Sequence, residues 1–182
     1  MKTRSQTKKE KEQFKEIVIV GDAGVGKTNL INKLSKQKFE RRYICTEKLE
    51  KITHENRIIY DFPGQVKFSN YGSNILKNVT LCIIMYDTTN TLSYKALKFW
   101  IDKIESYCDN PEIIIVGNKI DLINNNSSMT ENAPLYEDYI YIARESLIYI
   151  KGKPGKISNN IYQHIKASVR KDININTIFE KF

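Results

Sequence analysis

The sequence predicts an α/β fold in which a mostly parallel, six-stranded sheet is covered by helices on both faces. Residues 81–86 and 112–116 are continuous apolar runs of strand length, the pattern of parallel strands that are buried on both sides. Between them, residues 92–107 carry apolar side chains at helical spacing, as a crossover between parallel strands requires. A third apolar run, residues 17–20, leads through a glycine-rich turn into another helical pattern. Such a sheet binds its ligands at the carboxyl edge of its strands.

In the first half of the chain, periodicity and turn residues define the elements. Residues 1–13 have no apolar periodicity, so we expect a disordered basic tail ahead of one domain over residues 14–182. The first strand is expected at 14–20, and leucine and isoleucine at helical spacing place the first helix at 29–37. A polar loop follows it and leads into a short hairpin. The loop and the two hairpin strands are expected at 39–46, 48–53 and 57–61.

In the second half, a helix expected over 66–78 is weakened by Gly72. Asparagine and serine residues predict an insertion around 122–134. An apolar-periodic segment then predicts a helix that ends where glycine and proline begin a loop. This helix and loop, the last strand and a short final helix are expected at 135–150, 151–160, 161–167 and 174–182.

The composition excludes several classes of protein. The 182 residues, 41% hydrophobic and 27% charged, suit a single soluble globular domain. No apolar run is long enough to span a membrane, and the charged N-terminus is not expected to be a signal peptide. Three cysteines without a Cys-x-x-Cys pair (Cys45, Cys82 and Cys108) are expected to be free thiols in a reducing compartment, the cytoplasm or alternatively the nucleus.

The net charge of +8 leaves two interpretations open. Its lysines are interleaved with glutamates, which is typical of a solvated basic face, but a surface for an anionic partner is the alternative. Direct binding of nucleic acid is not expected, because no DNA- or RNA-reading motif is present.

The turn after the first strand has the sequence Gly21-Asp22-Ala23-Gly24-Val25-Gly26-Lys27-Thr28. Its glycines let successive backbone N–H groups face inward and form an anion nest at a helix N-terminus. Lys27 adds positive charge for β- and γ-phosphates, and the Thr28 hydroxyl is placed to ligate magnesium. A glycine-rich turn without a ligand is the plain alternative. The strand before this motif and the helix after it favour the phosphate-binding loop.

A second motif, Asn118-Lys119-Ile120-Asp121, follows the strand at 112–116. The Asp121 carboxylate can accept two hydrogen bonds, from N1–H and the 2-amino group of guanine. Adenine has no donor at either position and would leave a buried carboxylate unpaired, which can cost ~10⁴-fold in affinity. After a buried strand, and well downstream of a phosphate loop, this otherwise common turn sequence predicts guanine selection.

A third motif, Asp61-Phe62-Pro63-Gly64-Gln65, ends the strand at 57–61. A carboxylate at Asp61 suits a hold on magnesium opposite the phosphate loop. The Gly64 N–H can reach a γ-phosphate, and Gln65 can orient the attacking water. A plain Pro-Gly turn is the alternative for this stretch alone.

With these motifs in this order, residues 14–182 resemble a Ras-superfamily small GTPase, a P-loop NTPase with a Ras-like G domain. The resemblance implies GTP or GDP and Mg²⁺ as ligands, with Thr28, Thr46 and Asp61 around the metal. Thr46 matches the switch I threonine, Phe39 and Tyr43 match the guanine-edge aromatic and the switch I tyrosine, and the Ser168 to Arg170 loop resembles the last base-binding loop. The nucleotide contacts it implies are Asp22, Ala23, Gly24, Val25, Gly26, Lys27, Thr28, Asn29, Phe39, Tyr43, Thr46, Gly64, Asn118, Lys119, Asp121, Ser168, Val169 and Arg170. The catalytic residues it implies are Gln65, Lys27 and Gly64, and residues 82–87 with Trp100 are similar to the Rab and Ran branches.

Several positions depart from the family pattern. Pro63 replaces alanine, removing an N–H and fixing φ in switch II. The Ala23 methyl lies near the space that an arginine from a GTPase-activating protein and Gln65 would share. Glu47 stands where an apolar residue is usual. No cysteine lies near the C-terminus, so either the chain is not prenylated or a lipidated tail lies beyond the sequence.

The main hypothesis is therefore a monomeric guanine-nucleotide switch that hydrolyses GTP slowly, in vesicle or nucleocytoplasmic transport. Its expected partners are effectors, exchange factors and GTPase-activating proteins, with only an indirect membrane association. The departures at Pro63 and Ala23 favour an alternative, a nucleotide-locked interaction module that hydrolyses little GTP. A third hypothesis, an ATP-using kinase or ATPase, conflicts with the motif from Asn118 to Asp121.

Overall fold

The computed structural model describes residues 14–64, 73–123 and 163–181, and their α/β architecture is the one predicted. In these residues six strands form one sheet in the order β2-β3-β1-β4-β5-β6, parallel except for the antiparallel β2–β3 pair. The strands are β1 (Lys15–Val20), β2 (Glu50–His54), β3 (Arg57–Asp61), β4 (Leu81–Asp87), β5 (Glu112–Asn118) and β6 (Gln163–Lys166). β1 lies between β3 and β4, so the turn that follows it opens at the centre of the carboxyl edge.

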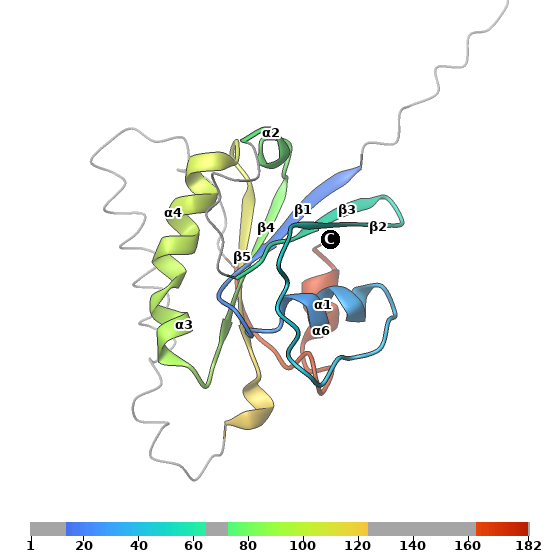
Figure 1. Ribbon diagram of the computed structural model, residues 1–182, viewed down its shortest axis with the longest axis vertical. Coiled ribbons are helices and arrows are strands. Elements are labelled where there is room, and N and C mark those ends of the chain that lie inside the picture. The colour runs from blue at the N-terminus through green and yellow to red at the C-terminus, as the bar shows by residue number, and fades with distance from the viewer. Residues whose placement is uncertain (1–13, 65–72, 124–162, 182) are drawn as a thin grey trace, which may run out of the picture.

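Helices cover both faces of this sheet, as Figure 1 shows: α3 and α4 lie on one side, and α1 and α6 on the other. The helices are α1 (Lys27–Leu34), α2 (Ser73–Leu76), α3 (Thr91–Lys95), α4 (Leu97–Tyr107), the 3₁₀ helix η2 (Ile120–Leu122) and α6 (Ile175–Phe179). The arrangement is a three-layer sandwich with the nucleotide motifs on one edge of its middle layer.

The side chains of β4 explain why its sequence is continuously apolar. Cys82, Ile84 and Tyr86 face the cluster formed with α3 and α4, while Ile83 and Met85 face the cluster formed with α1 and α6. All five are at most 1% exposed. From Leu81 to Tyr86 burial on both faces leaves no exposed positions, so the alternation typical of half-exposed strands is absent.

Several details differ from the sequence-based expectation. Helix α1 ends at Leu34 and not at 37, and the described part of the helix expected over 66–78 is only α2, because residues 66–72 lie outside the described residues. The helix expected at 92–107 is two segments, α3 and α4, because Ala96 has a ψ of −11° and opens the turn between them. Helix α1 begins at Lys27, so the last two residues of the phosphate loop already belong to it. In the hairpin, His54 pairs with Arg57 within the strands, and the turn is confined to Glu55 and Asn56.

Other expectations fall on residues that the structure does not describe. These are the tail at 1–13, most of the insertion around 122–134, the helix at 135–150, the loop at 151–160 and the switch II residue Gln65.

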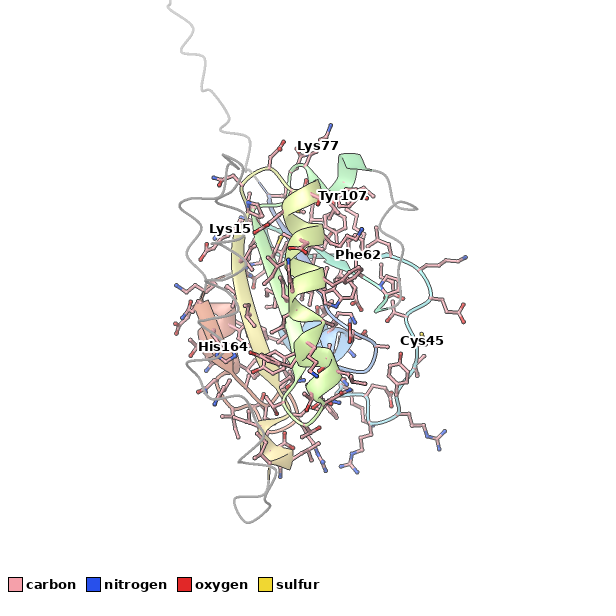
Figure 2. All side chains as sticks on the ribbon, turned by 90° about the vertical axis from the view of Figure 1, so that its left-hand side faces the viewer. Lys15, Cys45, Phe62, Lys77, Tyr107 and His164 are labelled. Carbon is pink, nitrogen blue, oxygen red and sulfur yellow. The ribbon has the colours of Figure 1, made fainter. Side chains whose placement is uncertain are left out.

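The cysteines agree with the prediction of free thiols. Cys45 lies on the outer loop between α1 and β2 and is exposed (Figure 2). Cys82 and Cys108 are buried with their Sγ atoms 3.9 Å apart, and burial raises the pKa of the Cys82 thiol well above its usual value. In the described part of the chain, every helix is too short or too polar to cross a bilayer.

Candidate functional site

The turn between β1 and α1 is folded as a phosphate-binding loop needs to be. Gly21, Gly24 and Gly26 have φ values of 139°, 75° and 106°, in the region that L side chains rarely adopt. At Gly26 a Cβ would also overlap the side-chain amide of Asn118. The fold and the neighbouring loop therefore both require glycine at this position.

Lys27 is held across the inside of this loop. Its ammonium donates to the carbonyl oxygens of Gly21, at 2.8 Å, and of Asp22, at 2.9 Å. The residue is only 5% exposed. Burial lowers the pKa of Lys27 to about 8, against the opposing effects of the Asp61 and Asp22 carboxylates. A phosphate near this ammonium would supply the negative charge that favours its protonated form.

Two threonines and an aspartate come together beside Lys27. The Thr28 hydroxyl donates to Asp61 Oδ2 at 2.7 Å and lies 3.2 Å from the Thr46 hydroxyl. Asp61 is 1% exposed, and burial raises the pKa of its carboxyl group. Its Oδ1 has no hydrogen-bond partner among the described residues. Because a buried, unpaired carboxylate oxygen is costly, this donor set fits a hard divalent cation such as Mg²⁺.

The loop from Phe39 to Thr46 is anchored at its start and exposed further on. Asn29 on α1 clamps the backbone of Glu40, donating from Nδ2 to the carbonyl oxygen at 2.9 Å and accepting from the N–H at 2.7 Å. Tyr43 is 63% exposed, and its ring lies close to Gly24 in the phosphate loop. Phe39 is half-buried against the α1 side of the core.

The second motif meets the loop of Ser168 and Val169, which is expected to bind the base, through the side chains of Asn118 and Ser168. Asn118 Nδ2 donates to the Val25 carbonyl at 2.8 Å, and Asn118 Oδ1 accepts from the Val169 N–H at 3.0 Å. Ser168 donates from Oγ to Asp121 Oδ1 at 2.6 Å. Asn118 therefore connects the phosphate loop to the residues expected to hold the base, and Ser168 orients Asp121. Arg170 follows on the surface.

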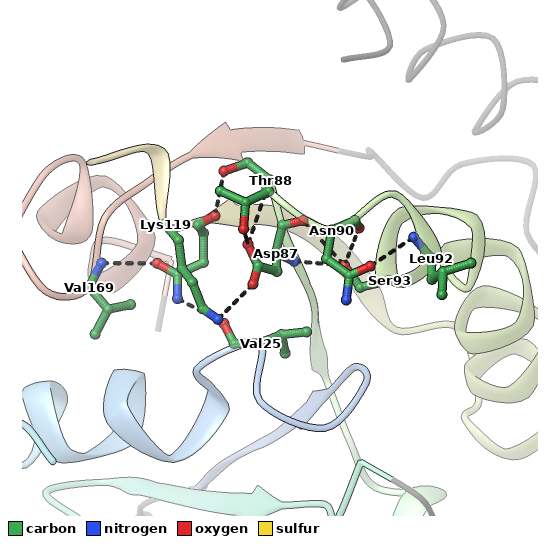
Figure 3. Close-up of polar contacts among 10 residues, drawn as sticks. Val25, Asp87, Thr88, Asn90, Leu92, Ser93, Lys119 and Val169 are labelled. Atoms are coloured by element: carbon green, nitrogen blue, oxygen red, sulfur yellow. Dashed lines mark hydrogen bonds and ion pairs between the residues drawn. The ribbon is translucent and has the colours of Figure 1, made fainter. Parts of the chain in front are cut away.

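Sequence reasoning assigned no role to Asp87, which Figure 3 places beside the second motif. Lys119 Nζ lies 2.6 Å from Asp87 Oδ2, and Thr89 donates to Asp87 Oδ1 from both its N–H and its hydroxyl. Although burial raises the pKa of Asp87, the hydrogen bonds from Lys119 and Thr89 bring it below its usual value. The end of β4 thus fixes the Lys119 side chain. The one signal in the sequence that could have identified Asp87 is its position at the end of β4, the strand next to β5.

The third motif packs directly on the phosphate loop. Phe62 is fully buried, Pro63 is buried, and a Cβ at Gly64 would overlap the backbone of Asp22 and Ala23. The structure thus brings Gly64 against Ala23, whose side chain is exposed. Gln65 lies outside the described residues, so its orientation stays a prediction.

Comparison with known proteins gives a consistent result. Residues 16–182 match the model of the "Ras family". The chain is 28% identical to "GTP-binding protein yptV5" of Volvox carteri over 93% of its length and 80% of that protein. It is 29% identical to "Ypt/Rab-type GTPase ypt71" of Schizosaccharomyces pombe, over 94% of its length and 80% of that protein. It is also 32% identical to "Ypt/Rab-type GTPase avaA" of Emericella nidulans, over 62% of its length and 61% of that protein.

Proposed function

The chain belongs to the Ras family, on its Rab-like branch, and from this premise we infer that it is a guanine-nucleotide switch that binds GTP and hydrolyses it to GDP. We place the switch in vesicle transport in the cytoplasm, acting as a monomer. The similarity to Ypt/Rab-type proteins supports this process.

The observation that carries the binding proposal is the double hydrogen bond of Asn118. One side chain, 3% exposed, joins the Val25 carbonyl of the phosphate loop to the Val169 N–H of the base-binding loop. Phosphates and base are therefore gripped by parts of a single connected network. Asp121, oriented by Ser168, would accept from the two guanine donors, and Lys119, fixed by Asp87, would line the base.

For Mg²⁺, the residues in place to hold the ion are Thr28, Thr46 and Asp61. When bound, Mg²⁺ neutralises negative charge on the β- and γ-phosphates. Other groups of the chain do the remaining work of positioning. Lys27 balances charge at the bridge between β- and γ-phosphates, the Gly64 N–H bonds to the γ-phosphate, and Gln65 orients the attacking water. Thr46 and Gly64 lie on the two switch segments, so losing the γ-phosphate would release both.

The alternative of a nucleotide-locked module is not favoured, because the relatives of Ypt/Rab type are GTPases by name. Pro63 is buried in switch II, and we expect turnover of GTP to be slow. The Ala23 methyl is at the surface, so we expect an arginine from a GTPase-activating protein to enter over Ala23. Effectors, exchange factors and GTPase-activating proteins are the partners we propose. The exposed loop around Tyr43 and Ile44 is their expected contact.

Calorimetry with purified protein tests the proposal. We expect GTP and GDP to bind tightly when Mg²⁺ is present, and ATP to bind at least 10³-fold more weakly. Overnight incubation with GTP should give GDP. Equal affinity for ATP and GTP would contradict guanine selection. If the amount of GTP stayed unchanged, the nucleotide-locked alternative would be favoured instead.

A further inference from the structure

A hydrogen bond outside the three sequence motifs connects the phosphate loop to helix α4. The indole Nε1 of Trp100 donates to Asp22 Oδ1 at 2.8 Å, across 78 positions of sequence. Trp100 is 2% exposed and belongs to the core cluster between the sheet and α4. An indole N–H can only donate, and a bond to a carboxylate is stronger than one between neutral groups. The loop is thus tied to a rigid part of the fold.

The Asp22 carboxylate needs such a partner because of where it is. It follows the first glycine of a loop whose backbone amides are arranged to bind anions, and its charge already acts on the Lys27 ammonium. A carboxylate free to turn toward that ammonium would compete with a phosphate for the same charge. The bond to Trp100 directs the carboxylate toward α4 instead.

The backbone of the same residue is equally engaged. The Asp22 carbonyl accepts from Lys27, and Gly64 of switch II packs directly on the Asp22–Ala23 peptide. At the other end of the loop, Asn118 holds Val25. The two side chains from outside the loop therefore grip it near both ends, and a movement at Asp22 would displace contacts to the lysine and to switch II together.

We propose that Trp100 is a positioning residue for the nucleotide site: its indole N–H holds the Asp22 carboxylate away from the phosphates and fixes the first half of the loop. This inference rests on the proposed guanine-nucleotide function. It assigns Trp100 an action through Asp22, without contact between the indole and the nucleotide.

The test is a double-mutant cycle read by the release of fluorescently labelled GDP. Trp100→Phe leaves the carboxylate without its donor, and we expect release about tenfold faster. Asp22→Ala removes the acceptor and should accelerate release less, because no free carboxylate remains. In the double variant, removing Asp22 should bring the rate back to within about threefold of Asp22→Ala alone. If Trp100 acted only by filling the core, the two effects would multiply and the double variant would be fastest, which would overturn the proposal.

A second measurement approaches the same bond from the loop side and does not depend on the folding of Trp100→Phe. Trp100 is the only tryptophan in the sequence, so tryptophan emission reports on this indole alone. We expect Asp22→Ala to shift the emission of the GDP-bound protein, and Asp102→Asn, an exposed carboxylate on the same helix, to leave it unchanged. Identical emission from wild type and Asp22→Ala would contradict the bond.

The outcomes separate this inference from the function beneath it. If wild type binds labelled GDP and all variants release it at the wild-type rate, the positioning role of Trp100 fails and the switch function stands. If wild type does not bind labelled GDP at all, the proposed function fails and takes this inference with it.

Discussion

The end of the site that we propose binds the base and the switch I loop differ in how far their side chains are buried. At the base end, Asn118 and Ser168 are buried and hydrogen-bonded, and Asp121 receives a bond from Ser168. In switch I, Tyr43 and Ile44 are 63% and 71% exposed. At the proposed metal site, the buried Asp61 has one carboxylate oxygen with no hydrogen-bond partner among the described residues. The polar side chains at the base end therefore bond to one another and to the backbone, whereas Asp61 has an oxygen with no protein partner among the described residues.

This difference separates two properties of a switch. A preorganised base pocket recognises GTP and GDP equally, so it determines which nucleotide is bound and not which state the protein is in. Only contacts with different affinity for the two nucleotides can shift a conformational equilibrium. We expect those contacts at the switch end, where Thr46 and Gly64 are proposed to meet the γ-phosphate.

The largest effect on nucleotide affinity should come from a substitution at the base end. Asp121→Ala removes the acceptor for guanine and the partner of the Ser168 hydroxyl, and we expect GTP and GDP affinity to fall equally, by about 10³- to 10⁴-fold. Calorimetry with both nucleotides measures this, with Asp109→Ala, an exposed position in the turn after α4, as the control. A loss confined to GTP would contradict the assignment of this end to base recognition.

A pH experiment on nucleotide-free protein examines Lys27, beside the proposed metal site. Because burial lowers the folded-state pKa of Lys27 from 10.5 to about 8, the unfolded chain binds more protons between these values. The free energy of unfolding should therefore rise as pH increases from about 8 toward 10.5, by up to about 3 kcal/mol from this group. Urea unfolding at several pH values measures the rise. Lys27→Met should lack this contribution, and parallel curves for the two proteins would argue against a buried ammonium.

The metal site should give a smaller effect that depends on Mg²⁺. Thr28→Ala removes the hydroxyl between Asp61 and Thr46, and we expect GDP affinity in Mg²⁺ to fall about 10- to 100-fold. With chelator present, the variant and wild type should bind alike. Thr28→Ser keeps the hydroxyl and serves as the matched control. An equal loss of GDP affinity with and without Mg²⁺ would show that Thr28 supports the structure of the loop and does not ligate the metal.

The smallest effect is expected at the anchor of switch I. Asn29→Ala removes two hydrogen bonds to the Glu40 backbone, and we expect nucleotide release to accelerate about 3- to 10-fold. Asn32→Ala, on the same helix, is the control. Labelled-GDP release measures both variants, and equal rates would show that the clamp does not restrain the loop.

Local patterns in the sequence were sufficient for the fold and for finding the motifs that we propose contact the nucleotide. Continuous apolar runs identified β4 and β5 because both faces of these strands are buried. The partners of the motifs could not be predicted, because Asp22 with Trp100 and Lys119 with Asp87 meet only through the order of strands and helices in space. The break at Ala96 escaped prediction for a related reason, since alanine is a strong helix former and no local residue marks the turn.

The close approach of Gly26 to the Asn118 amide limits how this protein can be re-engineered or can diverge. The loop that we propose holds the phosphates and the motif that we propose selects the base meet at Gly26 and Asn118, with no room for an extra carbon. Transplanting either motif alone from a nucleotide-binding protein of different specificity would therefore disturb the other. A change of base preference along this route must alter both motifs together, or be confined to positions such as Asp121 that lie beyond the shared contact.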